Sequence, residues 1–347
     1  MAILDNWVSE YVKNKEYRVA LGLPEEVAEE YEMLAQGEYN ANYFFVHPVT
    51  CLKLILRVNC GSQMHLNHQI SYEARALSFL AVSGRTPEVL WVDENEDHGV
   101  LVEKYLPGEH LDYRDDKQMK GAAQCLADIH SMRFPEWETI SCNPESIDAD
   151  VNMLIAPTDS LTAILEECEH MISRYMESDL GNVETKCRVR TLLDKAWDIT
   201  KSGECSSTYK CCINTELNST NFLIDDDNTY LVDWEKPLYG DPAQDLGHFL
   251  APTTTFWKTD VILGEDEIDN WIQEYIDCVD GRYDTAGIEQ RTRTFLLITC
   301  MRGICWCAMA WVEYQEPGRL LRNESTANKL EQYLSDDFLS MIEDIYK

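Results

Sequence analysis

Short runs of aromatic and branched apolar residues dominate the first third of the chain and predict β-strands. The predicted strands cover residues 43–46, 50–58, 89–92 and 99–105. The first two flank His47-Pro48 and predict a hairpin, and the last two flank an acidic turn. A helix is predicted over residues 70–83. The acidic stretch 1–34 is helix-prone, with Pro24 near a helix start. We therefore expect a mostly β first third.

After Pro107-Gly108 the apolar residues follow helical spacing. The predicted helices cover residues 117–131, 160–178, 184–201, 267–279, 287–313 and 325–346. One β-rich segment, 211–233, interrupts them. The pattern predicts a bilobal α+β protein, with a β-rich part over residues 1–105 and a mainly helical part over residues 106–347.

Composition narrows the class of protein. The 347 residues include 29 basic and 62 acidic side chains, a formal net charge of −33. Apolar residues make up 45% and charged residues 26%, which is typical of globular proteins and excludes a disordered acidic chain. The charge argues against nucleic acid and against anionic membrane surfaces as partners. It is compatible with a cationic small-molecule ligand, although a charged, soluble surface is the plainer explanation.

The first residues and the cysteines bear on the compartment. Residues 1–7 hold no basic segment followed by an apolar run, so no signal peptide is predicted. The most apolar stretch, 295–312, contains Arg302 and Gly303 and predicts a buried helix rather than a membrane span. The 13 cysteines include no Cys-x-x-Cys pair and predict reduced core thiols in a cytoplasmic protein. The oligomeric state is left open.

Candidate chemistry gathers in the β-rich segment. Asn221 follows Glu216 by five residues, and Asp233 comes after an Asp-rich turn. Mg²⁺ takes oxygen ligands, so Asn221 and Asp233 are candidate metal ligands. Glu216 is a candidate to orient or deprotonate an attacking hydroxyl. A hairpin with polar rims has a similar spacing, so these residues alone leave both interpretations open.

The neighbouring residues extend this pattern. Asn214-Thr215-Glu216, Asn221 and Asp233-Trp234-Glu235 are followed by Gly240-Asp241-Pro242 and Asp245-Leu246-Gly247. The stretch resembles the aminoglycoside and choline phosphotransferase family, which carries H-x-D-x-x-x-x-N, then D-W-E or D-F-E, then G-D-P-x-x-D-L-A. The resemblance implies a bilobal protein-kinase-like fold with a small β-rich N-lobe and a larger, mainly helical C-lobe. It also implies ATP- and Mg²⁺-dependent phosphate transfer to a small-molecule hydroxyl, with Glu216 catalytic and Asn221 and Asp233 binding metal.

The resemblance extends, more weakly, to the first third of the chain. Gly37, Tyr39 and Asn40 lie where the family has a short loop covering the phosphates, although an ordinary hairpin turn has the same pattern. Arg57 falls where the family places its phosphate-binding cation, which suits a side chain that binds phosphate oxygens bidentately. Lys53 lies at even spacing on the same strand and competes for this role.

Other candidates are assigned by position. Glu73 would be the helix carboxylate that steers the cation, or else a solvated helix charge. Glu103 and Tyr105 lie at the hinge between the lobes, where backbone groups of the family bind adenine. His130, in Leu126-Ala127-Asp128-Ile129-His130, resembles the end of a family helix and is expected to be structural.

Two residues depart from the family pattern: Asn214 replaces His, and Glu216 replaces Asp. An amide can partly copy the loop-fixing hydrogen bonds of the imidazole. The extra methylene moves the carboxylate by over ~1 Å, and a misplacement of that size can cost on the order of 10²-fold in rate. Because the metal residues are retained, we expect a variant active kinase. The alternative is a feeble or inactive pseudokinase-like nucleotide-binding protein.

The acceptor site is the least defined. Glu235 and Asp241 are candidate substrate contacts, with a structural role as the alternative for Asp241, and Asp245 is expected to brace the catalytic loop. The aromatic residues that could form a cage for a cationic amine are Trp257, Trp271, Tyr275, Trp306, Trp311 and Tyr314. Helical spacing more often places such residues in a core. An amino-sugar, amino-alcohol or antibiotic-like acceptor is expected, and a protein kinase is disfavoured because the usual activation segment is missing.

Overall fold

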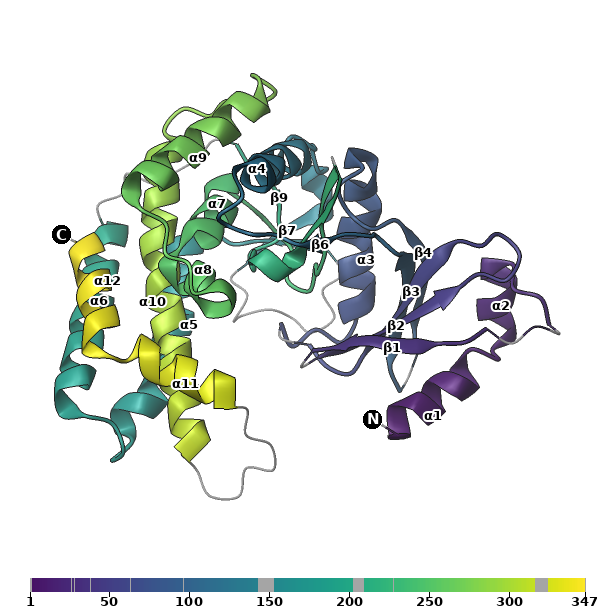
Figure 1. Cartoon of the computed structure of the whole chain (residues 1–347), viewed down its shortest axis with the longest axis horizontal. Helices are drawn as coiled ribbons and strands as arrows, with labels where there is room; N and C mark the ends of the chain where they lie inside the picture. Colours follow the sequence, from purple (N-terminus) through teal and green to yellow (C-terminus); the bar gives the residue numbers. More distant parts are fainter. Residues whose placement is uncertain are drawn as a thin grey trace.

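The computed structural model shows a sheet-containing part near the N-terminus and a larger helical part beside it (Figure 1). It describes residues 2–25, 27, 29–37, 39–62, 64–95, 97–142, 153–201, 209–226, 228–315 and 324–346. The bilobal α+β architecture expected from the sequence is confirmed. The division between residues 105 and 106 stays a prediction, although the last strand of the first sheet ends at Lys104.

The N-terminal sheet has five antiparallel strands in the order β1-β2-β3-β5-β4. The strands are β1 (Glu32–Gln36), β2 (Asn40–Val46), β3 (Lys53–Asn59), β4 (Val89–Glu94) and β5 (Gly99–Lys104). Helix α3 (Gln69–Leu80) packs against β4 and β5. Helices α1 (Ala2–Tyr11) and α2 (Lys15–Leu21) supply residues to the core on the other face.

Strand alternation decides which cation of β3 enters the site. Leu54, Leu56 and Val58 are buried in the core shared with α1 and α2. Successive side chains of a strand point to opposite faces, so Arg57 lies on the other face, toward α3. Lys53 begins the strand, is exposed, and lies over the ring of Tyr105 at 5.8 Å. Arg57 rather than Lys53 is therefore the buried cation.

The prediction of a helix that starts near Pro24 is wrong for the described residues. No described residue from 24 to 31 is helical, and residues 32–36 form strand β1. Residues 26 and 28 lie outside the described residues. The guanidinium of Arg18 donates to the carbonyls of Pro24 and Val27 and pairs with Glu29 at 2.9 Å. These contacts hold the segment outside a helix, and β1 then finds its hydrogen bonds on β2. Non-local pairing outweighs a local helical preference here.

The C-terminal part is helical around a central helix, α10. Its helices are α4 (Asp116–His130), α5 (Ser160–Glu177), α6 (Val183–Lys201), α7 (Pro242–Leu250), α8 (Pro252–Thr259), α9 (Glu265–Val279), α10 (Ile288–Gln315), α11 (Glu324–Tyr333) and α12 (Asp336–Ile345). Helix α10 packs against α5 and α7. The helix expected over residues 325–346 is two helices, because Ser335 caps α12 and ends the first.

Short strands in the same part carry the loops of the site. Strand β9 (Cys211–Ile213) pairs with β12 (Leu238–Gly240), and β10 (Phe222–Asp225) pairs with β11 (Asn228–Leu231) and β6 (Glu109–His110). Strands β7 (Thr139–Ser141) and β8 (Leu154–Ala156) form a parallel pair. The predicted β-rich segment is confirmed, and the loops between its strands carry Glu216 and Asp233.

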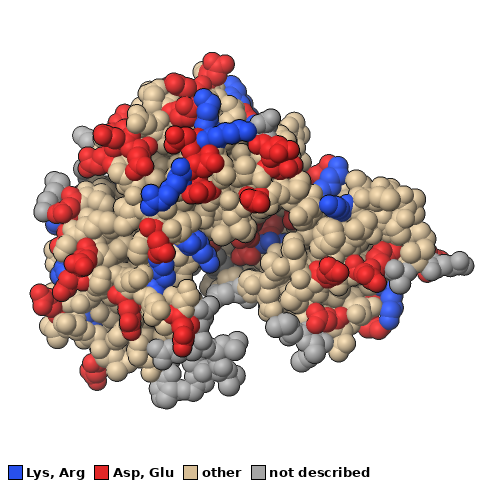
Figure 2. Space-filling model, in the orientation of Figure 1, with Lys and Arg blue, Asp and Glu red and all other residues tan. Residues whose placement is uncertain are grey.

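Helix α10 is long and apolar enough to cross a membrane by length and composition, but 67% of its most apolar window is buried within the protein. That burial is typical of a core helix, as the sequence predicted. Among the described residues the cysteines are unpaired, and most of them are buried. Figure 2 shows a hollow between the two parts of the molecule, with acidic and basic side chains at its base.

Candidate active site

A buried carboxylate holds the loop between β9 and β10. Asp245, fully buried on α7, accepts hydrogen bonds from the backbone amides of Asn214 (2.8 Å) and Thr215 (2.7 Å). Thr215 has a φ of +73°, which a β-branched residue adopts only when its surroundings enforce it. His130 Nε2 lies 3.2 Å from Asp245, and its Nδ1 contacts the Tyr275 hydroxyl at 2.7 Å. The predicted brace is confirmed, and His130 is part of the core behind it.

The amide of Asn214 connects this loop to the one that carries Asp233. Its Nδ2 donates to the carbonyl of Asp233 at 2.9 Å, and its Oδ1 accepts from the amide of Glu216 at 3.2 Å. Asn221 Nδ2 donates to the carbonyl of Glu216 at 3.0 Å. Asn214 therefore supplies loop-fixing hydrogen bonds of the kind expected when Asn replaces His. Asp233 itself is held at a φ of +64°.

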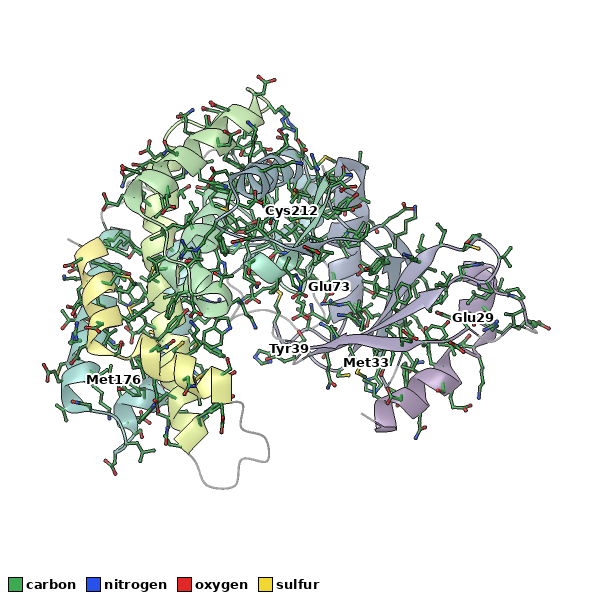
Figure 3. All side chains as sticks on the ribbon, in the orientation of Figure 1. Glu29, Met33, Tyr39, Glu73, Met176 and Cys212 are labelled. Carbon is green, nitrogen blue, oxygen red and sulfur yellow. The ribbon has the colours of Figure 1, made fainter. Side chains whose placement is uncertain are left out.

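Arg57 reaches across from the sheet into a group of carboxylates. Its Nε lies 3.2 Å from Glu73 Oε2, and its Nη2 lies 3.2 Å from Asp233 Oδ1 and 2.9 Å from Glu235 Oε1. Asn40 Nδ2 also donates to Glu235. Glu73 and Tyr39 lie on the side of the N-terminal part that faces the helical part (Figure 3). The two parts of the protein therefore meet through charged side chains.

Burial shapes the ionisation of this group. Burial opposes the charge of Arg57, but Glu73, Asp233 and Glu235 outweigh it and raise the pKa of Arg57. Burial raises the pKa of Glu73 to about 8, against the opposing effect of Arg57. Glu103, beside the same guanidinium, has its pKa raised by burial to about 7. Arg57 therefore stays charged, and burial makes the carboxyl groups of Glu73 and Glu103 harder to ionise than ordinary carboxyl groups.

Sequence reasoning missed the residues around Glu216. Arg302 on α10 lies 3.2 Å from Glu216 Oε1 and pairs in a two-pronged fashion with Glu167 of α5, at 2.9 and 3.1 Å. Lys236 Nζ lies 3.8 Å from Glu167. Although burial opposes it, Arg302 and Lys236 lower the pKa of Glu167 to about 2.

The signal for this arrangement was present in the apolar run 295–312. A lone arginine there requires a buried partner. Gly303 beside it is also required, because a Cβ at that position would lie 2.7 Å from the Cβ of Thr253 on α8. Arg302, which argued against a membrane span, therefore marks the contact between α10 and the loop that carries Glu216.

A cavity of about 440 Å³ opens beside these residues. Its lining includes the predicted site residues Gly37, Tyr39, Glu216, Asp233 and Glu235. Trp257 and Trp306 also line it, with ring centroids 5.4 Å apart in an edge-to-face arrangement. The cavity is therefore suited to hold an acceptor next to Glu216 and Asp233.

Several candidates lie elsewhere. Asp241 caps α7 and pairs with Arg291 at 2.6 Å, so its contacts are structural and it does not line the acceptor cavity. Trp271 and Tyr275 are buried core residues rather than parts of a cage. Tyr105 packs edge-to-face on Phe44, 5.3 Å between centroids, at the end of β5.

The candidate metal ligands, Asn221 and Asp233, suit Mg²⁺ better than a metal that needs a complete shell of protein ligands. Within the described ranges, no group of three or more His, Cys, Asp or Glu side chains could hold a metal ion. Asn221 and Asp233 offer one amide oxygen and one carboxylate, and the Asp233 side chain is 46% exposed to the cleft. Mg²⁺ usually takes one or two carboxylates and completes its shell with waters and substrate phosphates.

The comparisons with known proteins agree with this geometry. The fold is that of the protein-kinase-like phosphotransferases. Residues 30–282 match the phosphotransferase enzyme family, and because this range is well over half of the chain, the chain belongs to that family. Members of the family phosphorylate hydroxyls of small molecules.

Solved structures share the fold at low sequence identity. A spectinomycin phosphotransferase, in complex with ADP and spectinomycin, matches with a TM-score of 0.60 and 11% identity over 92% of both chains. An ethanolamine kinase from Plasmodium vivax matches with a TM-score of 0.60 and 13% identity over 91% of this chain and 83% of its own. An amicoumacin kinase, with AMP-PNP and Ca²⁺, matches with a TM-score of 0.60 and 14% identity over 97% and 95%.

Proposed function

We propose that the protein transfers the γ-phosphate of ATP to a hydroxyl of a small molecule, with Mg²⁺ as the metal. The observation that carries this proposal is Asp233. Its carboxylate lies 3.2 Å from Arg57 of the sheet, and its carbonyl accepts from Asn214 of the loop that carries Glu216. Asp233, the proposed metal ligand, thus lies beside both Arg57, which would bind phosphate, and the loop of Glu216, which would activate the acceptor.

Each residue has a role in this proposal. Arg57 binds phosphate oxygens, with Glu73 behind it, and the loop of Gly37, Tyr39 and Asn40 covers the phosphates. Asn221 and Asp233 would hold the Mg²⁺, which offsets charge on the phosphate oxygens when bound. The backbone near Glu103 and Tyr105 would receive the adenine.

Glu216 would accept the proton of the acceptor hydroxyl. The acceptor oxygen forms the new bond to the γ-phosphorus while the bond from that phosphorus to the bridging oxygen of ADP breaks. Positioning dominates this chemistry, so the carboxylate must be held firmly, and Arg302 at 3.2 Å supplies a hold.

The acceptor would occupy the 440 Å³ cavity. Glu216 and Glu235 and the indoles of Trp257 and Trp306 line its wall, which suits a molecule that carries an amine. A cytoplasmic location, where ATP and Mg²⁺ are abundant, belongs to the same proposal.

A second candidate function is nucleotide binding without efficient catalysis. The observation that favours it is the ion pair between Glu216 and Arg302, because a carboxylate paired with a guanidinium is a weaker base. ADP release across a panel of amino-sugars, amino-alcohols and antibiotics distinguishes the two functions.

The test of the mechanism is Asp233→Ala. We expect turnover to be abolished, while the folded protein still shows a thermal shift with ATP. The matched control is Asp198→Asn, because Asp198 is 75% exposed on α6 and should leave turnover unchanged. Normal turnover in Asp233→Ala contradicts the proposed mechanism.

A further inference from the structure

A second cavity, of about 370 Å³, adjoins the acceptor cavity and shares Tyr39, Arg302 and Trp306 with it. Much of its wall is apolar, including Met171 and Leu238. A molecule whose hydroxyl lies near Glu216 could therefore extend an apolar body into this space. The inference rests on the proposed function, because it concerns the other end of the same acceptor.

The second cavity is lined by a larger share of basic side chains than the protein as a whole. The chain carries 62 acidic against 29 basic side chains. Among the described residues that line the second cavity, however, Lys236 and Arg302 face a single carboxylate, Glu167. Because Arg302 is also paired with Glu216, its charge is already offset, and Lys236, with one carboxylate at 3.8 Å, is the cation that favours an anionic group on the ligand.

Lys236 is the cation best placed to meet that group. The guanidinium of Arg302 is engaged by Glu167 and Glu216. Lys236 makes a looser contact, 3.8 Å from Glu167, within the part of the chain that the structure describes. Its ammonium has three donors, so donors remain for a ligand.

The backbone around Lys236 is firmly placed. Its carbonyl accepts from the Thr215 hydroxyl at 2.9 Å, next to Glu216 in the catalytic loop. The carbonyls on either side accept from Gln69 Nε2 at 2.7 Å and from the Tyr72 hydroxyl at 2.6 Å. The start of the Lys236 side chain is therefore held next to the loop that carries Glu216.

A buried amide belongs to the same wall. Gln244 lines the cavity and is only 7% exposed, and its Oε1 has no hydrogen-bond partner among the described residues. A buried acceptor without a partner costs about 1–3 kcal/mol. This oxygen is itself shielded from the cavity, so its cost belongs to the packing of the wall.

We propose that the acceptor is a hydroxylated carboxylic acid with an apolar body. Its hydroxyl lies at Glu216, its apolar body lies along Met171 and Leu238, and its carboxylate is bound by Lys236. The wall of the first cavity would then bind an amine and Lys236 in the second cavity would bind a carboxylate. Together they would select a molecule that carries these two groups at opposite ends.

The test compares three probes that differ only at one end: 6-hydroxyhexanoate, 6-hydroxyhexanamide and 6-amino-1-hexanol. Binding to the full-length protein is measured by calorimetry without nucleotide, so the outcome does not depend on turnover. We expect the carboxylate to bind roughly 10- to 100-fold more tightly than the amide, the difference that a hydrogen bond to a charged group makes. Binding of the amide as tight as that of the carboxylate, or no saturable binding of the carboxylate, overturns the proposal. The amine, which the acidic wall of the first cavity can also bind, measures the affinity of that wall.

Variants assign the effect to Lys236. Lys236→Met should abolish the preference for the carboxylate, and Lys236→Arg should keep it. Lys13→Met removes an equally charged side chain that is 66% exposed on the distant sheet-containing part, and it should change nothing. A preference that survives in Lys236→Met overturns the assignment. If the protein binds the carboxylate more tightly than the amide but turns over no acceptor, the proposed function is contradicted and the assignment of Lys236 is not.

Discussion

Shortening Glu216 to aspartate tests whether the longer base is an adaptation. The Glu216 carboxylate lies 3.2 Å from Arg302 Nη2, and Asp245 holds the loop backbone through two amides. Removing one methylene retracts the carboxylate by ~1.5 Å. Because the loop cannot follow, the distance to Arg302 grows beyond hydrogen-bond reach and the carboxylate leaves its place beside the acceptor.

The loss of position should outweigh the loss of the ion pair. The Glu216 side chain is 33% exposed, and a partly exposed pair of this kind contributes at most about 1 kcal/mol to stability. A misplacement of ~1 Å, in contrast, costs on the order of 10²-fold in rate. We therefore expect Glu216→Asp to lower kcat about 100-fold, with little change in unfolding or in the KM for ATP.

Steady-state ADP release, with an acceptor that the natural protein phosphorylates, measures kcat and the KM for ATP. Denaturant unfolding measures the change in stability. Glu216→Gln is the matched control: it keeps the length but removes the charge, so kcat should fall and nucleotide affinity should stay. If Glu216→Asp is as active as the natural protein or more active, the reasoning is refuted and the extra methylene is a defect.

Two further predictions concern stability. Burial raises the pKa of Glu103 to about 7 from 4.5, so its contribution to folding is complete below about pH 4.5 and is lost as pH rises through 7. In the natural protein we expect the unfolding free energy, measured in urea, to fall by roughly 2–3 kcal/mol between about pH 5 and 8 because of this group. Glu103→Gln should remove that part of the fall, and an unchanged pH profile in the variant contradicts the prediction. Asp245→Asn leaves one of the amides of Asn214 and Thr215 without its acceptor and should lower the unfolding free energy by about 1–3 kcal/mol. An Asp245→Asn protein as stable as Asp198→Asn would show that the brace is dispensable.

Local pattern was sufficient for most of the fold. Strands β2 to β5 and the long helices lie within a few residues of the predicted ranges, because apolar periodicity reports directly on the buried face of an element. The failure at strand β1 has a non-local cause. Strand β1 forms because β2 and Arg18 offer distant partners to a segment whose own residues favour a helix.

The site divides in the same way. The spacing of Glu216, Asn221 and Asp233 made them candidate site residues, because residues beside one short hairpin are close in space. The phosphotransferase was predicted only when residues 214–247 as a whole were seen to resemble the family. The partner of Glu216 lies 86 positions away on α10, and the cation beside Asp233 lies 176 positions away on β3. No local pattern encodes such separations.

The sequence by itself determined the bilobal architecture and the acidic surface, since these follow from periodicity and composition. It also determined the class of chemistry, through the resemblance of residues 214–247 to a known family. Only the tertiary structure decided which charges face one another. It placed Arg57 among three carboxylates, gave Glu216 the guanidinium of Arg302, and put Lys236 and Gln244 into a cavity of a strongly acidic protein. The physical reason is that the energy of a charge depends on its neighbours in space, and packing alone brings these neighbours together.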